Sequence, residues 1–165
     1  QDAGLHCDNG ITVDDHCQTS HPDIYAAGDC TNHPNPILGR RLRLESVPNA
    51  MEQARTAGAN MLGGDKTYAA VPWFWSDQYE LKLQMLGFSA DAEDSVLRGD
   101  PETLQFAQFY LAEGKIVAVD AVNSPKEFMV AKQLFGLVVA PDALANAEVD
   151  LKTLLPSASM RSIQN

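Results

Sequence analysis

The sequence predicts an α+β fold made of two parts, residues 1–65 and residues 72–155, that differ in character. Three observations support this prediction. The first part contains one long segment with helical periodicity, the second contains several short segments with strand periodicity, and another helical segment follows those strands. Strands that are not separated by helices favour an antiparallel sheet over a parallel one.

The first part is expected to begin with a hairpin and a short buried strand. Asn9-Gly10 lies between two extended segments, and this dipeptide is a strong signal for a two-residue hairpin turn. The apolar run from Ile24 to Ala27 predicts a strand that ends at Gly28-Asp29. A loop is expected from His33 to Pro36, where proline and asparagine are concentrated.

One clear helix is expected next. Ser46 is a suitable N-cap, Pro48 fits the first turn, and Gly63-Gly64 marks the end. Between these signals, apolar or small residues recur at helical spacing and predict the buried face of the helix. They are Val47, Ala50, Met51, Ala54, Ala57, Gly58, Met61 and Leu62.

The second part is expected to form an antiparallel meander. From Tyr79 onward, apolar residues alternate with Glu80, Lys82 and Gln84, which is typical of a half-buried strand. Glycine-containing turns separate the remaining strand segments. The predicted strands cover residues 95–98, 104–111 and 116–122, with turns at 99–101 and 113–115.

A second helix is expected to follow the meander. Ser124-Pro125-Lys126-Glu127 has the pattern of a capping box with proline at the first helical position. This helix should run to about Phe135 and end at Gly136. Short helices are expected over residues 141–155, and residues 156–165 are expected to form a loose tail.

Composition excludes some classes of function. The net charge of −10 argues against binding to nucleic acid, whose phosphates require a basic surface. No apolar run reaches the length of a membrane span, and the residues after Gln1 show no basic segment followed by an apolar run, so no signal peptide is predicted. Three cysteines without a Cys-x-x-Cys motif favour a reducing compartment, so a cytoplasmic protein is expected.

All four histidines and all three cysteines lie within the first 33 residues. Their spacings match no zinc-binding pattern, so no metal site is predicted. Because the histidines cluster in one segment, the sequence offers no Ser-His-Asp arrangement and no catalytic side chain is predicted. No Gly-x-Gly-x-x-Gly motif occurs, so the sequence contains no pyrophosphate-binding loop of the dinucleotide-binding type.

Two segments carry a family resemblance: Ile24-Tyr25-Ala26-Ala27-Gly28-Asp29-Cys30 and Val71-Pro72-Trp73-Phe74-Trp75-Ser76-Asp77-Gln78. Together they resemble the putidaredoxin reductase-like group of FAD-dependent NADH reductases, which feed ferredoxins and rubredoxins. The resemblance covers nearly the whole chain. It implies that residues 1–65 are the second half of a FAD-binding α/β domain and that residues 72–155 are the C-terminal interface domain. The chain would then be the C-terminal part of such an enzyme.

The resemblance also implies a reaction. Hydride passes from NADH to FAD, and single electrons then pass to a ferredoxin- or rubredoxin-type protein. The sequence does not distinguish NADH from NADPH, and in the family both the Gly-rich loop and the nucleotide substrate site belong to other parts of the enzyme. The flavin performs the chemistry and the protein positions it.

Flavin contacts are expected at two places in the first part. A carboxylate that follows a glycine at the end of a strand can accept hydrogen bonds from ligand hydroxyls, and in the family Gly28-Asp29 would close on the ribityl chain of FAD. The dipeptide alone favours an ordinary surface turn, and the preceding segment, residues 19–27, favours the flavin contact. Ser46 and Val47 begin the helix, where unpaired N–H groups favour negative charge. The resemblance implies that the main chain of Val47 faces the pyrimidine edge of the flavin.

Partner contacts are expected elsewhere. The resemblance places Trp75 beside the isoalloxazine, toward the surface where the iron–sulfur partner docks, and Trp73 near the same surface. The general alternative is that both indoles belong to the core. Arg40, Arg41 and Arg43 are the densest positive charge in the chain and are predicted to lie in a loop. They would suit docking of an acidic ferredoxin.

Three alternatives remain at this point. Disulfide reductases of the glutathione-reductase type share the Ala-x-Gly-Asp strand, but their interface domain carries a catalytic histidine, and no histidine follows His33 here. A flavoprotein resembling apoptosis-inducing factor is a related possibility. The third is a non-catalytic interface or dimerisation module that self-associates.

Overall fold

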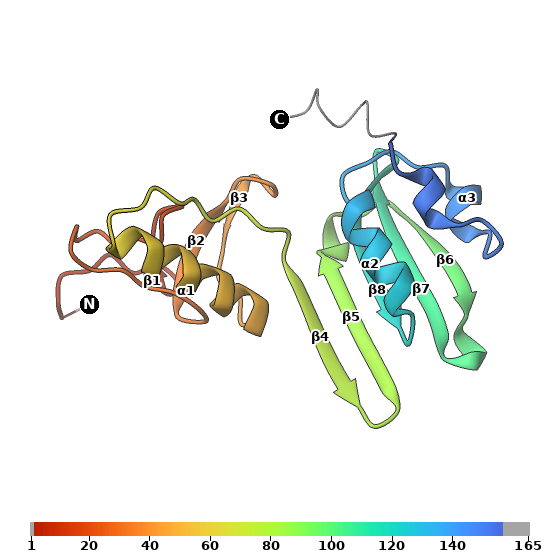
Figure 1. Cartoon of the computed structure of the whole chain (residues 1–165), viewed down its shortest axis with the longest axis horizontal. Helices are drawn as coiled ribbons and strands as arrows, with labels where there is room; N and C mark the ends of the chain where they lie inside the picture. Colours follow the sequence, from red (N-terminus) through yellow and green to blue (C-terminus); the bar gives the residue numbers. More distant parts are fainter. Residues whose placement is uncertain (1, 157–165) are drawn as a thin grey trace. The chain divides into compact units, whose positions relative to one another are not determined.

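Residues 2–156 are described by the computed structural model, in which the chain divides into two units, residues 1–74 and residues 75–165 (Figure 1). Each unit is described by itself. The predicted tail at residues 156–165 lies outside the described residues, apart from Pro156. In the described part of the chain, no helix is both long and apolar enough to cross a membrane.

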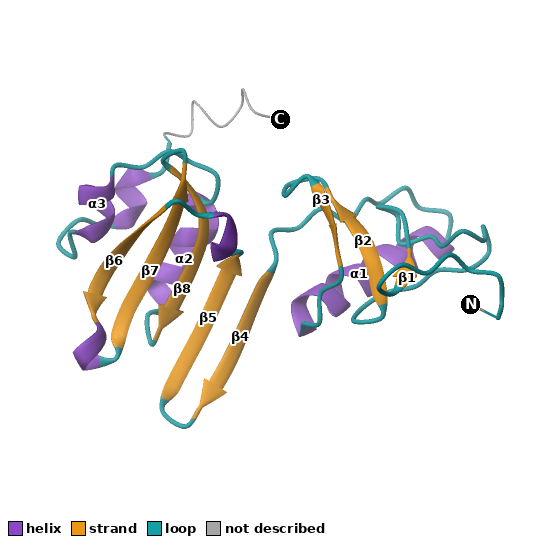
Figure 2. Cartoon of the chain, turned by 180° about the vertical axis from the view of Figure 1, so that it is seen from behind, coloured by secondary structure: helices purple, strands orange, loops and turns teal. Residues whose placement is uncertain are grey.

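The first unit combines a small sheet with one long helix. Strand β2 (Thr31–Asn35) lies between β1 (Ile11–Thr12), to which it is parallel, and β3 (Arg40–Leu42), to which it is antiparallel (Figure 2). The predicted turn at Asn9-Gly10 is confirmed. Both residues have positive φ, and Cys7 pairs with Ile11 across the turn.

Two predictions for this unit, one of a strand and one of a loop, are wrong. Residues 24–27 are not a strand, because only Tyr25 forms a bridge, with Gln18, and the segment is hydrogen-bonded on that one side. The strand lies instead at Thr31–Asn35, where the loop from His33 to Pro36 was expected. Proline and asparagine are poor strand formers, but β2 receives ladder partners from both β1 and β3, and that pairing overrides local preference.

Helix α1 (Val47–Met61) begins and ends as predicted, but its buried face is not the predicted one. The Asn49 N–H donates to Ser46 Oγ, and Gly63, at φ 84°, follows the last turn. The predicted apolar stripe is largely exposed, with Val47 at 55% and Met51 at 49%. Only Ala57 of that stripe is fully buried, beside a set of polar residues, namely Asn49, Gln53, Thr56 and Asn60.

The second unit is built on a five-stranded sheet in the order β4-β5-β8-β7-β6 (Figure 2). The last three strands form the predicted antiparallel meander, but β5 pairs with β8 and not with β6, so the sheet as a whole is not a simple meander. The strands are β4 (Trp73–Gln78), β5 (Leu81–Gly87), β6 (Asp94–Asp100), β7 (Gln105–Ala112) and β8 (Lys115–Val122).

Tyr79 does not begin a strand as predicted. It lies in the turn between β4 and β5, fully exposed and with φ 54°. The alternation that starts at Tyr79 is correct only from Leu81 onward, where β5 begins. The strand at Trp73–Gln78 gives the two tryptophans regular extended backbone.

Helix α2 (Pro125–Leu134) covers one face of this sheet, as the views from both sides show (Figures 1 and 2). The helix is confirmed, but the capping box is not formed, because the Ser124 side chain makes no cap hydrogen bond. Helix α3 (Pro141–Ala145) and a 3-10 turn at Leu151–Leu154 confirm the short helices. The core between helix and sheet is apolar and includes Phe109, Ile116, Val119, Phe128, Leu134 and Leu144.

Candidate functional site

The Gly28-Asp29 turn lies directly against helix α1. Gly28 is buried with φ 87°, and a Cβ at this position would lie 3.4 Å from the Cβ of Ala50. The positive φ and the close approach both favour glycine over any other residue. Its N–H donates to Gln53 Oε1 at 2.7 Å, and its carbonyl accepts from the Thr31 N–H at 3.0 Å. Asp29 is exposed on this turn, and no described residue donates to its carboxylate.

The N-terminus of α1 is open to an anionic group. Val47 is its first residue, so its N–H has no acceptor within the helix. The first turn contains no acidic side chain that would neutralise the partial positive charge of the helix end. Glu45, which precedes the helix, is paired with Arg43. Ser46 caps the helix through Asn49, so its role in the described structure is to fix the helix start.

Trp73, not Trp75, lines the hollow beside this helix end. A cavity of about 20 Å³ lies between the first turn of α1 and residues 68–73. Trp73 shares it with Ser46, Pro48 and Tyr68. Trp75 belongs to the second unit, where its side chain is 38% exposed on β4. All of the predicted residues except Trp75 therefore lie in the first unit.

The three arginines lie on or next to a strand and not in the predicted loop. Arg40 and Arg41 are part of β3, and Arg43 follows it. Arg41 donates to the carbonyls of Val13 and Asn32, so its charge is used within the unit. Arg43 donates to the Asp29 carbonyl at 3.1 Å and pairs with Glu45. The side chain of Arg40 is exposed.

A buried polar layer lies beneath α1, and sequence reasoning missed it. His33 is 1% exposed, and its ring meets the Tyr68 ring edge-on at 5.1 Å. Burial, assisted by Arg41, lowers the pKa of His33 to about 4, and burial raises the pKa of Tyr68 to about 12. The Tyr68 hydroxyl donates to Asn49 Oδ1 at 3.0 Å. The available signal was the four-residue spacing of Asn49 and Gln53, on the face opposite the apolar stripe.

In the described residues, one group has the composition of a metal site: Asp14, Asp15 and His16. Both ring nitrogens of His16 are already paired, one with Asp15 at 2.8 Å and the other with Asp65 at 2.9 Å. These carboxylates, Asp65 first, raise the pKa of His16. The neighbouring Cys17 is buried, which raises the pKa of its thiol to about 11 and makes it a poor nucleophile.

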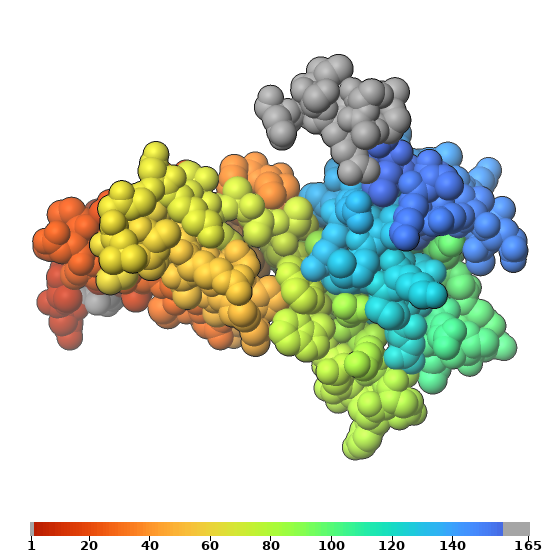
Figure 3. Space-filling model, viewed as in Figure 1, coloured from red at the N-terminus to blue at the C-terminus, as the bar shows by residue number. Residues whose placement is uncertain are grey.

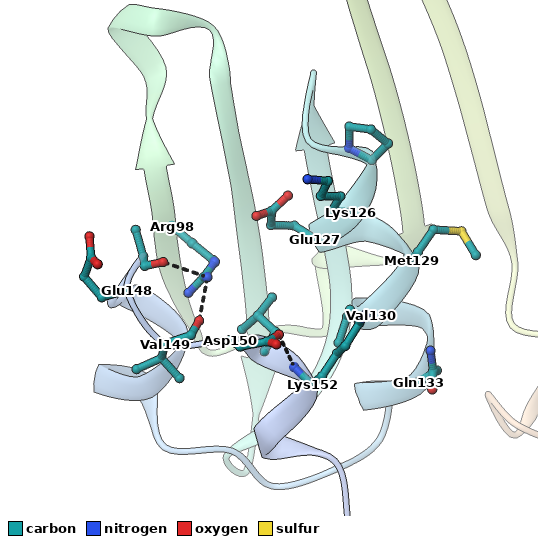
Figure 4. Close-up of a pocket in the computed structure, with 13 residues that line it drawn as sticks. Arg98, Lys126, Glu127, Met129, Val130, Gln133, Glu148, Val149, Asp150 and Lys152 are labelled. Carbon is teal, nitrogen blue, oxygen red and sulfur yellow. Dashed lines mark hydrogen bonds between the residues drawn. The ribbon is translucent and has the colours of Figure 1, made fainter.

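A larger cavity, of about 780 Å³, lies in the second unit between α2 and residues 147–152 (Figure 4). Arg98 reaches it from β6, and its guanidinium donates to four carbonyls around the end of α3, including Val149 at 2.8 Å. These four hydrogen bonds from Arg98 hold residues 144–149 in place. None of the residues predicted to contact flavin or partner lines this cavity.

Comparison with known proteins matches both units. Residues 73–155 match the family described as "Reductase C-terminal", and residues 1–54 match "Pyridine nucleotide-disulphide oxidoreductase". The ferredoxin reductase subunit of 5,5'-dehydrodivanillate O-demethylase from Sphingobium sp. is 47% identical over 155 residues, which cover 92% of this chain and 38% of the relative. Putidaredoxin reductase from Pseudomonas putida is 44% identical, with 94% and 37% covered.

Solved structures agree. The ferredoxin reductase of the CYP199A2 system from Rhodopseudomonas palustris superimposes with a TM-score of 0.87 at 36% identity, covering 94% of this chain and 39% of that one. The covalent putidaredoxin reductase–putidaredoxin complex gives a TM-score of 0.85 at 44% identity, covering 93% and 37%. This chain therefore spans less than two fifths of the length of the relatives it matches.

Proposed function

This chain belongs to the reductase C-terminal family, and from that premise we propose that it is the C-terminal part of a FAD-dependent NAD(P)H:ferredoxin oxidoreductase. In this proposal residues 1–65 complete the FAD-binding domain and residues 72–155 form the interface domain. One observation carries this proposal. The same unit contains the exposed Asp29 carboxylate and the N-terminus of α1 at Val47, whose partial positive charge no acidic side chain of the first turn neutralises. Relatives with named ferredoxin reductase activity match the chain over more than nine tenths of its length.

The residues present fit a flavin. Asp29 offers acceptors for ligand hydroxyls, and Gly28 presents backbone without a side chain at the turn. The first turn of α1 offers N–H groups and a partial positive charge to the electron-rich edge of the ring system. When bound, FAD would accept hydride from NAD(P)H and deliver single electrons. The chain's own task is to bind and orient it.

The partner in this proposal is a ferredoxin- or rubredoxin-type iron–sulfur protein. One matched structure is a covalent complex of a reductase with its ferredoxin-type partner, putidaredoxin. Trp75, exposed on β4, is the residue we assign to this docking, with Trp73 at the adjoining end of the same strand. Arg40, whose side chain is exposed on β3, is the arginine we assign to the docking role. A cytoplasmic location is part of the same proposal.

A second candidate has its own support. The exposed stripe on α1, formed by Val47, Met51, Met61 and Leu62, favours self-association of the chain as a non-catalytic module. In the space-filling view the surface of α1, in gold and yellow, is open to solvent (Figure 3). Thiol chemistry has less support, since the three cysteines are free and Cys17 is buried.

Stopped-flow kinetics with the complete reductase would test the proposed function. Flavin reduction by NADH is measured first, and reduction of the iron–sulfur partner by pre-reduced enzyme second. Trp75→Ala should slow the second step and spare the first, because removal of the indole disturbs the docking surface. Tyr79→Ala, at the exposed turn of the same hairpin, serves as the control. If Trp75→Ala slows only the first step, the residue has been assigned to the wrong side of the flavin.

A further inference from the structure

Gln53 joins helix α1 to the turn that carries Asp29. Its side chain is fully buried, at 0% exposure, in the second turn of the helix. The Gly28 N–H donates to Gln53 Oε1 at 2.7 Å. The Thr31 hydroxyl lies 2.7 Å from the same oxygen and 2.8 Å from the Gly28 carbonyl oxygen, and donates its proton to one of them. Gln53 Oε1 therefore ties the helix to the Gly28 end of a four-residue turn and lies within hydrogen-bond distance of the Thr31 end.

Only the oxygen end of this amide is used. No described residue accepts a hydrogen bond from Gln53 Nε2, although the atom is buried. Burying such a donor without an acceptor is unfavourable, and leucine would fill a similar volume without that penalty. The hydrogen bonds to Oε1 must offset this cost. Gln53 therefore acts as a hydrogen-bond acceptor for the turn.

The other buried amides of α1 serve different segments. Asn49 donates to the Leu44 carbonyl and accepts from Tyr68. Asn60 donates to the carbonyls of His16 and Lys66, near the opposite end of the helix. Among the described polar residues on this helix face, Gln53 alone bonds the Gly28-Asp29 turn. This makes Asn60 a matched control, since it is also a buried amide on the same helix.

We infer that Gln53 is a positioning residue for cofactor binding, which fixes the Asp29 carboxylate in register with the N-terminus of α1. The inference rests on the proposed function, because it gives Asp29 and Val47 the same ligand. A glycine at φ 87° can adopt several other backbone conformations, and the bond to Gln53 selects one of them. The two cofactor contacts then belong to one rigid assembly, and the entropy cost of ordering the turn is met before the ligand arrives.

A double-mutant cycle in the holoenzyme tests this inference. The FAD dissociation constant is measured for Gln53→Leu, for Asp29→Ala and for the double variant, each at matched folded fraction. We expect Gln53→Leu to weaken FAD binding about tenfold and the double variant to be no weaker than Asp29→Ala alone. Gln53→Glu keeps an oxygen acceptor and should restore affinity to within about threefold. Asn60→Leu should lower thermal stability, but its effect on FAD binding should not be coupled to that of Asp29→Ala.

Each outcome has a distinct meaning. If the two losses add, or if Gln53→Glu binds FAD as poorly as Gln53→Leu, the positioning role is overturned while Asp29 keeps its assignment. If Asp29→Ala binds FAD as the parent does, the proposed cofactor site itself is wrong. Should Gln53→Leu fail to fold, hydrogen exchange at the Gly28 amide of the parent protein decides. Exchange at the rate of an unstructured peptide would mean that the bond to Gln53 is absent.

Discussion

The two units bury different kinds of residues. The second unit packs α2 against its sheet through large apolar side chains such as Phe109, Phe128 and Leu134. The first unit has a small apolar cluster of the buried residues Cys17, Ala57 and Tyr68, with partly buried Tyr25, Ala27 and Ala70 packed against it, and it also contains many buried polar residues. These include Thr31, His33, Asn35, Asn49, Gln53, Thr56 and Asn60.

The difference shows what each unit is built for. Burial of apolar area contributes stability directly, whereas buried polar groups contribute little beyond the cost of removing them from water. The second unit therefore contains the interactions that an independent domain needs. The first unit uses its buried positions to hold a turn and a helix end in place, and leaves the apolar stripe of α1 outside.

The largest expected effect is the loss of a core side chain from the second unit. Phe128 is fully buried between α2 and the sheet, and Phe128→Ala should lower the free energy of unfolding by about 3–5 kcal/mol. Urea unfolding followed by circular dichroism measures this change. Val138→Ala, at an exposed position, is the control and should change stability little. A loss below about 1 kcal/mol would mean that the apolar core does not dominate this unit.

The polar layer of the first unit should make its stability depend on pH. Because the pKa of His33 falls from 6.5 to about 4 on folding, the unfolded chain binds a proton in this interval that the folded chain does not. The contribution of neutral His33 to the free energy of unfolding should be fully present above pH 6.5. It should be lost as the pH falls toward 4, by roughly 3 kcal/mol.

The matched variant is His33→Phe, which keeps an aromatic ring beside Tyr68 but cannot titrate. Thermal unfolding between pH 4 and 7 should show a shallower pH dependence for this variant than for the parent protein. Equal slopes would show that His33 is already charged in the folded state, or that it is not buried as described.

The exposed stripe on α1 should drive self-association of this chain. Met51 is 49% exposed in the middle of the stripe, and Met51→Glu would remove an apolar contact from each of two copies. The dimer dissociation constant should rise about a hundredfold, since each buried methionine contributes about 1.5–3 kcal/mol. Sedimentation velocity measures the change. Met129→Glu, an exposed methionine on α2, is the control, and an equal effect there would remove α1 from the interface.

The parts of the fold that local chemistry decides could be predicted from the sequence. The Ser46 cap, the Gly63 stop and the Asn9-Gly10 turn depend on neighbouring residues alone, and all three are confirmed. The strand at residues 24–27 and the buried stripe of α1 were wrong, because each depends on what lies beside it. Whether a segment is a strand or has a buried face depends on the segment that packs beside it. The periodicity of one segment does not say which segment that is.

The candidate site divides in the same way. Asp29 and Val47 were assigned through family resemblance and stay predictions, although the structure joins them in one unit. Gln53 was missed, because a polar residue in a helix is most often at the surface and its contact lies 25 residues away. Only the fold brings that oxygen to the Gly28 N–H.

The most direct test of the account is the FAD dissociation constant of the complete reductase with and without the Asp29 carboxylate. Asp29→Ala removes a charged acceptor for ligand hydroxyls, which costs about 1.5–3 kcal/mol, and should weaken binding by roughly one to two decades. Asp23→Ala removes an exposed carboxylate from the same segment and should leave affinity unchanged. Fluorescence titration of the apoenzyme with FAD measures both. Equal affinities for Asp29→Ala and the parent enzyme would contradict the claim that this turn holds the flavin.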